Sequence, residues 1–301
     1  MPFYTLKGDL VKMPVDAIVN AANVNLKMVE GVGRAIFHAA GDQELTKACK
    51  DIGKCMPGNA VVTPSFNLTS TKMIIHAVAP IYLNGKHDEE KILRKTYNSV
   101  LNIALENGFK TIAFPLLGGE FNWPLRECFD IACDEIKKFI FEHDLDLTVY
   151  LVMYKNFPNT LSDYTQESLT RYITSHFKVN EKERTLTKLK IDFKYTYDKF
   201  CNNISDEELI KKANISSQTI YEIKNNPKFK PSKNLVIALA LALDLSRDNL
   251  KYFLRDFNII LSNSRLFDLI LLYFLDNNIK DIYKINNALF AYDFLPLGEK
   301  F

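Results

Sequence analysis

Short apolar runs alternate with longer amphipathic stretches through the first half of the chain. The short runs are rich in valine, isoleucine and aromatic residues, as strands are, and they lie at 3–6, 15–20, 60–63, 73–78, 111–114 and 149–153. The longer stretches have helical spacing and lie at 33–40, 43–52, 89–106 and 124–142. Strands that alternate with helices predict a sheet with helices on both faces. In such a fold a ligand binds at the carboxyl ends of the strands.

The second half of the chain has helical patterning only. Serine followed by acidic residues at 205–208 is typical of a helix start, and Asn214-Ile215-Ser216 predicts a tight turn before the next helix. Further helices are expected at 217–225, 232–243, 248–257, 262–276 and 280–290. A helix at 159–177 is expected to close the first domain, before a charged segment with few large apolar residues. We therefore predict an α/β domain at 1–177, a linker at 178–190 and an all-helical domain at 191–301.

Composition excludes several classes of protein. A net charge of +2 over 301 residues gives no global attraction to nucleic acid or to a membrane. The five cysteines form no CxxC pair, so neither a disulfide framework nor a zinc site is expected. The first residues do not resemble a signal peptide, and the longest apolar runs are too short to cross a bilayer. We expect a cytoplasmic protein that holds no metal and no cofactor.

Two glycine-bearing loops follow predicted strands. The first begins with Asn20-Ala21-Ala22-Asn23, and its turn Gly31-Val32-Gly33 opens a helix. Backbone N–H groups on a glycine turn at a helix N-terminus suit a phosphate. Asparagine amides both donate and accept, which suits the hydroxyl groups of a sugar. The pattern therefore favours binding of a nucleotide sugar.

These loops belong to a longer set of motifs that resembles the macro domain, a module that binds ADP-ribose. The matching blocks occur in the family's order over about residues 1–175, and they are Lys7-Gly8-Asp9-Leu10, 16–23, Gly31-Val32, Ala35-Ile36, Ala39-Ala40-Gly41, Phe114-Pro115-Leu116-Leu117-Gly118-Gly119 and Trp123-Pro124. The resemblance implies a three-layer α/β/α fold with a mixed central sheet. It also implies that ADP-ribose, or a substrate that carries an ADP-ribosyl group, is the partner.

The resemblance implies a role for each candidate residue. Asp9 would accept from the adenine amino group, and Asn23 would donate to the distal ribose with Asn20 behind it. Each has a structural alternative, because Asp9 suits a helix cap and asparagine suits turns. The expected ligand-binding residues are Asp9, Leu10, Asn20, Asn23, Gly31, Val32, Gly33, Gly118, Gly119, Glu120, Phe121 and Tyr154.

For two aromatic residues and two histidines, a structural role is the alternative to a role in the site. Phe121 would lie against a ribose, or it is a core aromatic residue. Tyr154 would pack on adenine, or it is an edge aromatic residue. His38 and His76 have no nucleophile at a recognisable spacing, which favours structural roles for both.

The first loop departs from the pattern of hydrolytic macro domains. Those proteins usually carry a glycine run where this chain has Met28-Val29-Glu30, and the best-known branch has an acid where this chain has Gly33. We hypothesise that Glu30 supplies the missing acid and, with Asn23, forms the catalytic pair. The alternative is that Glu30 points to solvent, because a carboxylate beside a diphosphate is repelled. Hydrolysis would then depend on positioning of the substrate.

Residues 206–254 resemble the helix-turn-helix domain of phage repressors, and the helical tail is similar to regions fused to some bacterial macro domains. The second helix of such a motif enters the major groove, where Gln218 and Asn225 would suit adenine edges. However, residues 206–256 hold nine basic and seven acidic residues, whereas DNA readers have a clear basic face. The balance favours protein interaction or dimerisation over DNA binding.

Three functions compete on these observations. The two glycine loops favour a hydrolase that acts on an ADP-ribosyl ester, in protein de-ADP-ribosylation or in deacetylation of O-acetyl-ADP-ribose. Glu30 and Gly33 favour a reader of ADP-ribose without catalysis. The helical tail alone favours a ligand-controlled regulator that binds DNA. We predict the hydrolase.

Overall fold

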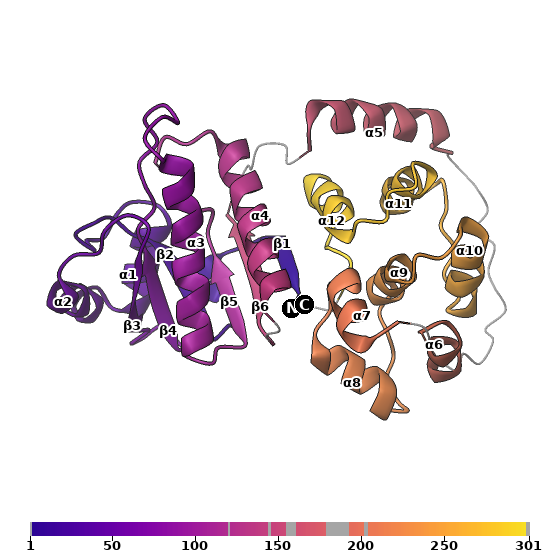
Figure 1. The fold of residues 1–301 in the computed structure, drawn as a ribbon, viewed down its shortest axis with the longest axis horizontal. Coiled ribbons are helices and arrows are strands. Elements are labelled where there is room, and N and C mark those ends of the chain that lie inside the picture. Colours follow the sequence, from indigo (N-terminus) through magenta and orange to yellow (C-terminus); the bar gives the residue numbers. More distant parts are fainter. Residues whose placement is uncertain are drawn as a thin grey trace. The chain divides into compact units, whose positions relative to one another are not determined.

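A computed structural model describes residues 2–119, 121–143, 146–154, 161–178, 193–201 and 204–298. Contacts between residues divide the chain into two compact units. One unit is Phe3–Pro158, and the other is Asn159–Phe301 together with Met1–Pro2. Figure 1 shows a sheet with helices in the first unit and helices alone in the second.

The first unit is built on a six-stranded sheet in the order β1-β6-β5-β2-β4-β3. All neighbouring strands are parallel except β3 and β4, which are antiparallel. This mixed sheet confirms the predicted fold. The strands are β1 (Phe3–Lys7), β2 (Ala17–Ala21), β3 (Ala60–Pro64), β4 (Met73–Ala77), β5 (Thr111–Phe114) and β6 (Thr148–Met153).

Helices cover both faces of this sheet. On one face α1 (Val32–Ala40) and α2 (Asp42–Ile52) bury Ile36, Phe37 and Leu45 against Ile18 and Ile74 of the sheet. The alternation of side chains along a strand sends the next residues to the opposite face. There Tyr97 of α3 (Glu89–Glu106) packs on Phe114 of β5, and α3 lies beside α4 (Leu125–Glu142) (Figure 1).

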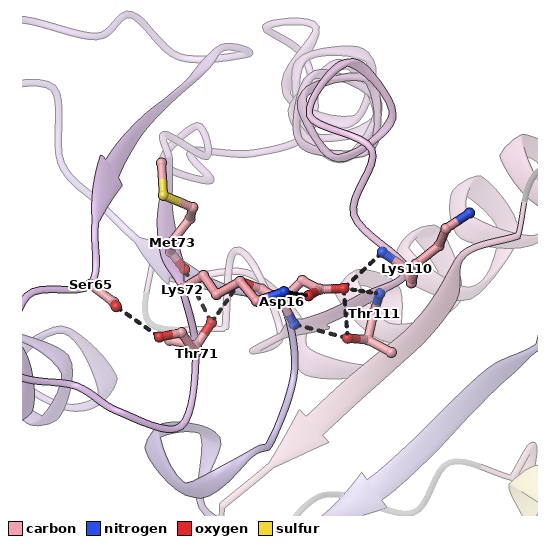
Figure 2. A network of polar contacts seen from close by, with 7 residues as sticks. All are labelled: Asp16, Ser65, Thr71, Lys72, Met73, Lys110 and Thr111. Atoms are coloured by element: carbon pink, nitrogen blue, oxygen red, sulfur yellow. Dashed lines mark hydrogen bonds and ion pairs between the residues drawn. The ribbon is translucent and has the colours of Figure 1, made fainter.

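Asp16 joins three strands at their amino ends (Figure 2). Its carboxylate accepts from the backbone N–H groups of Lys110, at 2.8 Å, and Thr111, at 3.1 Å, which begin β5. It also accepts from Lys72 Nζ at 2.7 Å, and its carbonyl oxygen accepts from the backbone of Lys72 and Met73 at the start of β4. Burial alone would raise the pKa of Asp16, but these hydrogen bonds outweigh it and lower the pKa. One residue, Asp16, therefore links the amino ends of β2, β4 and β5.

The second unit is a set of helices around one apolar core. Serine side chains cap five of the described helices, because Ser162, Ser205, Ser216, Ser232 and Ser246 each accept from a backbone N–H in the first turn. The helices are α5 (Asp163–His176), α6 (Phe193–Cys201), α7 (Asp206–Ala213), α8 (Ser217–Asn225), α9 (Lys233–Ala242), α10 (Arg247–Asp256), α11 (Leu266–Asp276) and α12 (Ile282–Ala291).

The expected tight turn lies between α7 and α8. Asn214 has a left-handed backbone, with φ of 53°, and Ser216 caps α8 directly afterwards. Within the ranges given above, no helix is long and apolar enough to span a membrane.

One expected boundary differs from the structure. The sequence places α5 as the closing helix of the first domain, yet Leu169 of α5 is fully buried in the core of the helical unit. The ring of Tyr172 also meets Tyr273 of α11, 5.5 Å between centroids. The contacts divide between Pro158 and Asn159, so they do not follow the expected boundary after residue 177. The reason is that an amphipathic pattern shows which face is buried, but not against which core. Beyond residue 178, the predicted linker lies outside the described residues.

Candidate functional site

A cleft of about 570 Å³ opens at the carboxyl ends of the adjacent strands β1, β6, β5 and β2, the edge that the sequence pattern predicts. Its walls come from the segments that follow these strands and from the start of α1. The residues that line it are Gly8, Asp9, Leu10, Val11, Ala21, Gly31, Val32, Arg34, Ala35, His38, Pro115, Leu116, Gly118, Gly119, Leu125, Val152, Met153 and Tyr154.

The N-terminus of α1 lies at this cleft. Gly31 is the N-cap residue with φ of 72° and ψ of −131°, and no side chain caps the helix. The first N–H groups of a helix have no partner within it, so those of α1 are available to an anion. Gly33 does not line the cleft. A Cβ at Gly33 would lie 2.6 Å from Val29 Cγ2, so a larger residue here would displace the Val29 side chain.

The second glycine loop forms another wall of the cleft. Gly118 has φ of 92°, and a Cβ there would lie 2.9 Å from Cys128 Sγ and 3.0 Å from Trp123 Cδ1. Only glycine therefore allows the loop to adopt this conformation. Phe121 is half-buried and does not line the cleft, and its backbone N–H donates to the Gly118 carbonyl at 2.8 Å. Glu120 lies outside the described residues.

Asp9 has the capping role that was expected as its alternative, and it also lies at the cleft. Its carboxylate accepts from the Val11 N–H at 3.2 Å and so caps the 3-10 helix η1 (Leu10–Lys12), while Lys12 Nζ lies 3.5 Å away. The residue also lines the cleft beside Leu10. Tyr154 lines the same end and its side chain is 70% exposed, so a planar ligand has access to its ring.

Asn20 is buried and is not among the residues that line the cleft. Its Nδ2 lies 3.1 Å from Nδ1 of His76. Because this amide nitrogen can only donate, Nδ1 accepts and Nε2 carries the proton that is donated to Thr63 Oγ1, 3.0 Å away. Among the residues that the structure describes, Asn20 Oδ1 has no hydrogen-bond partner, and a Cβ on Gly33 would lie 3.5 Å from it.

The buried His76 predicts a pH-dependent stability. Burial lowers its pKa from 6.5 to about 4, so the unfolded chain takes up a proton in this range and the folded chain does not. Stability therefore falls as the pH drops from 6.5 to about 4, by as much as about 3 kcal/mol. Denaturant unfolding at several pH values, followed by fluorescence of Trp123, measures this loss in the first unit.

The matched control for this effect is His76→Gln. A glutamine amide does not titrate, so the variant is expected to be less stable but to lose the added pH dependence above about pH 5. Equal slopes for the variant and the natural chain would contradict the assignment.

Asn23 stabilises its own loop. Its Oδ1 accepts from the N–H groups of Asn25 at 3.0 Å and Lys27 at 3.2 Å, and its Nδ2 donates to the Lys27 carbonyl at 3.0 Å. This is the turn role that the sequence offered as the alternative. Asn23 is not among the residues that line the cleft, but its second Nδ2 hydrogen remains for a ligand.

Glu30 points to solvent, which is the second of the two placements expected from the sequence. Its side chain is 79% exposed, it pairs with Arg34 at 2.8 Å, and it does not line the cleft. Arg34 and His38 do line the cleft, although neither was predicted from the sequence as a binding residue. Their spacing of four along a helix that begins at the glycine turn could have indicated it. The His38 ring lies 2.8 Å from the Asp42 carboxylate.

Over the described parts of the chain, no cluster of three or more His, Cys, Asp or Glu residues is arranged to hold a metal ion. The cysteines in these parts are buried and form no disulfide. Burial raises the pKa of the Cys49 thiol to about 11, so this thiol near His76 stays protonated at neutral pH.

Comparison with known proteins assigns this arrangement. The Macro domain family model matches residues 19–132. The O-acetyl-ADP-ribose deacetylase of Escherichia fergusonii is 38% identical over 156 residues, covering 50% of this chain and 87% of that protein. The same-named protein of Enterobacter sp. is 41% identical over 152 residues, covering 49% and 83%. A solved structure of the Oceanobacillus iheyensis macrodomain with ADP is 31% identical, with a TM-score of 0.47, covering 56% of this chain and 90% of that chain.

The matched segment contains the carboxyl end of β2, the glycine turn that opens α1, and the second glycine loop. These elements form part of the cleft, and the segments after β1 and β6 complete it. Relatives near 40% identity match this chain over more than four fifths of their own length. The chain therefore belongs to the macro domain family.

Proposed function

We propose that the first unit binds ADP-ribose and hydrolyses an ADP-ribosyl ester, with O-acetyl-ADP-ribose as a substrate. The observation that carries the proposal is the uncapped N-terminus of α1 at a cleft of about 570 Å³, opposite a second glycine loop. This arrangement suits a diphosphate between two flanking groups. The names of the relatives from E. fergusonii and Enterobacter support the ester as the substrate.

Each part of the ligand has a partner in this proposal. The Asp9 carboxylate accepts from the adenine amino group, and Tyr154 packs on the base. The N–H groups at Gly31 and Val32 bind the diphosphate. The remaining N–H of Asn23 donates to the distal ribose. Gly118 and Gly119 close the other side without side chains that would fill the cleft.

The reaction needs little acid–base chemistry from the chain. Water attacks the acetyl carbonyl carbon, the bond between that carbon and the ribose oxygen breaks, and the products are acetate, ADP-ribose and a proton. Asp9 is the only carboxylate among the cleft-lining residues of the described chain, and it lies at the adenine end of this proposed pose. We therefore propose that catalysis depends on how the substrate and the water are positioned.

Release of acetate from O-acetyl-ADP-ribose tests the proposal. The natural chain is expected to release it, and Asn23→Ala is expected to be at least about tenfold slower because the loop and one ribose contact are lost. Binding of ADP-ribose without release would instead support a reader. Absence of both binding and release would contradict the whole assignment.

Glu30→Gln separates the two catalytic hypotheses within the same assay. Since Glu30 is exposed and paired with Arg34, we expect its loss to change turnover by less than about threefold. A general base contributes about a hundredfold or more. A loss of that size, with affinity for ADP-ribose intact, would restore Glu30 as the base.

We propose an interaction role for the helical unit, with DNA binding as the less favoured alternative. Polar side chains on α8 bond to one another or to α7. Gln218 Nε2 donates to Glu222 at 3.1 Å, and Lys224 Nζ pairs with Asp206 at 2.6 Å. Tyr221 on the same helix is 59% exposed. An exposed aromatic residue between paired charges supports a protein surface better than a phosphate-binding one.

A further inference from the structure

The helical unit contains a cavity that the proposed function does not use. It lies between α10 and α11 and is bounded by the segment that connects them, and its volume is about 430 Å³. This volume falls within the usual range for small-molecule sites. All of the described residues that line it belong to the second unit.

Aliphatic side chains form the greater part of its wall. Leu250 and Leu254 from α10 are buried, while Ile260, Leu272 and Leu275 are half-buried. Half-buried side chains of this size at one concave site leave apolar area that a ligand would cover. The wall therefore suits an alkyl chain or a similar apolar group.

Cations lie along one side of the cavity. Arg247, Lys251 and Arg255 line it and are spaced four residues apart on α10, which places them on one face of that helix. Lys280 also lines the cavity, whereas Asp248 is the only acidic residue among the described lining residues. The cavity is thus apolar with an excess of positive charge.

Among the described residues, two of these cations have a carboxylate partner at short distance, and the other two have a distant one or none. Arg247 pairs with Asp276, and Lys280 pairs with Asp244. Lys251 Nζ lies 3.9 Å from the Asp248 carboxylate. Within the described chain, no carboxylate lies within ion-pair distance of Arg255.

We propose that this cavity binds an apolar carboxylate, such as a medium-chain fatty acid. The alkyl chain lies against the leucine and isoleucine side chains, and the carboxylate bonds to Lys251 and Arg255. A guanidinium group binds a carboxylate through two parallel hydrogen bonds, which a lone ammonium cannot do. A concave apolar wall distinguishes this site from a surface for a polyanion, which would need charge without a cavity.

Calorimetric titration of the full chain with laurate tests the proposal. We expect saturable binding of one laurate per chain, and an affinity that rises about fourfold per methylene from octanoate to laurate. Lys251→Gln with Arg255→Gln is expected to weaken binding at least about tenfold. The variant Lys228→Gln with Lys230→Gln is the control, because it removes the same charge from exposed positions outside the cavity and should leave the affinity unchanged.

Three results would overturn the proposal. The first is equal binding of laurate and dodecyltrimethylammonium, which would show that the cations play no part. The second is equal weakening by the control pair, which would show that only total charge matters. The third is an absence of laurate binding together with binding of duplex DNA that depends on Lys251 and Arg255, which would assign these cations to phosphate contacts. Both residues are exposed, so the variants are expected to fold.

Discussion

Gly31→Val is expected to reduce the affinity for ADP-ribose by at least about a hundredfold. Gly31 has φ of 72° and ψ of −131°, a conformation that a residue with a Cβ adopts only at a cost of about 1–3 kcal/mol, and a β-branched residue is the least able to adopt it. The loop is therefore expected to rearrange. The N–H groups at the start of α1 then no longer converge on the position proposed for the diphosphate, which loses its principal hydrogen-bond donors.

Calorimetric titration with ADP-ribose measures this loss, and Gly108→Val is its control. Gly108 also has a positive φ, of 64°, and a Cβ there meets nothing within 4 Å. It lies between α3 and β5, at the amino end of the sheet, away from the cleft. Both variants are expected to lose stability, but only Gly31→Val should lose binding. Retention of ADP-ribose binding by Gly31→Val would contradict the site.

Replacement of Lys233 and Arg265 by methionine together is expected to destabilise the helical unit by about 3–5 kcal/mol. Asp268 is fully buried, and its carboxylate accepts from Lys233 Nζ at 2.6 Å, Arg265 Nε at 2.9 Å and the Ser262 N–H at 3.0 Å. Without the two cations, a buried charge keeps only one of these three partners. The reverse change, Asp268→Asn, should be milder, because the Lys233 and Arg265 side chains are 35% and 43% exposed and can be hydrated.

The two units can be followed separately in one unfolding experiment. The chain has a single tryptophan, Trp123, which is buried in the first unit. The part of the far-ultraviolet circular dichroism change that comes from the helical unit should therefore shift to lower denaturant, while the Trp123 fluorescence transition and the part that comes from α1 to α4 stay in place. Lys228→Met with Lys230→Met, at exposed positions, should change stability by about 1 kcal/mol at most. If the double variant at Lys233 and Arg265 loses no more stability than this control, the ion pairs of buried Asp268 contribute little to the stability of the helical unit.

The strands and the glycine loops were predictable because their signals are local. A run such as 15–20 is short and rich in valine and isoleucine, which favours a buried strand, and Gly31 and Gly118 stand where the backbone has a positive φ. Roles that depend on where a side chain points were less predictable. Asn23 bonds to its own loop, and Glu30 turns to Arg34, because nearby partners compete with any ligand for short polar side chains.

The sequence alone determined the order of elements in the first unit, its macro domain motifs and the sheet edge where the cleft lies. These features follow from the spacing of hydrophobic residues and from the residue types in turns, and both signals extend over only a few residues. Only the tertiary structure decided that α5 packs with the helical unit, that Asn20 contacts His76 across two strands, and that Arg34 and His38 line the cleft. It also revealed the cationic cavity beside α10. Each of these features depends on contacts between residues that are far apart in the sequence. The local spacing of hydrophobic residues shows which face of an element is buried, but not which residue it contacts.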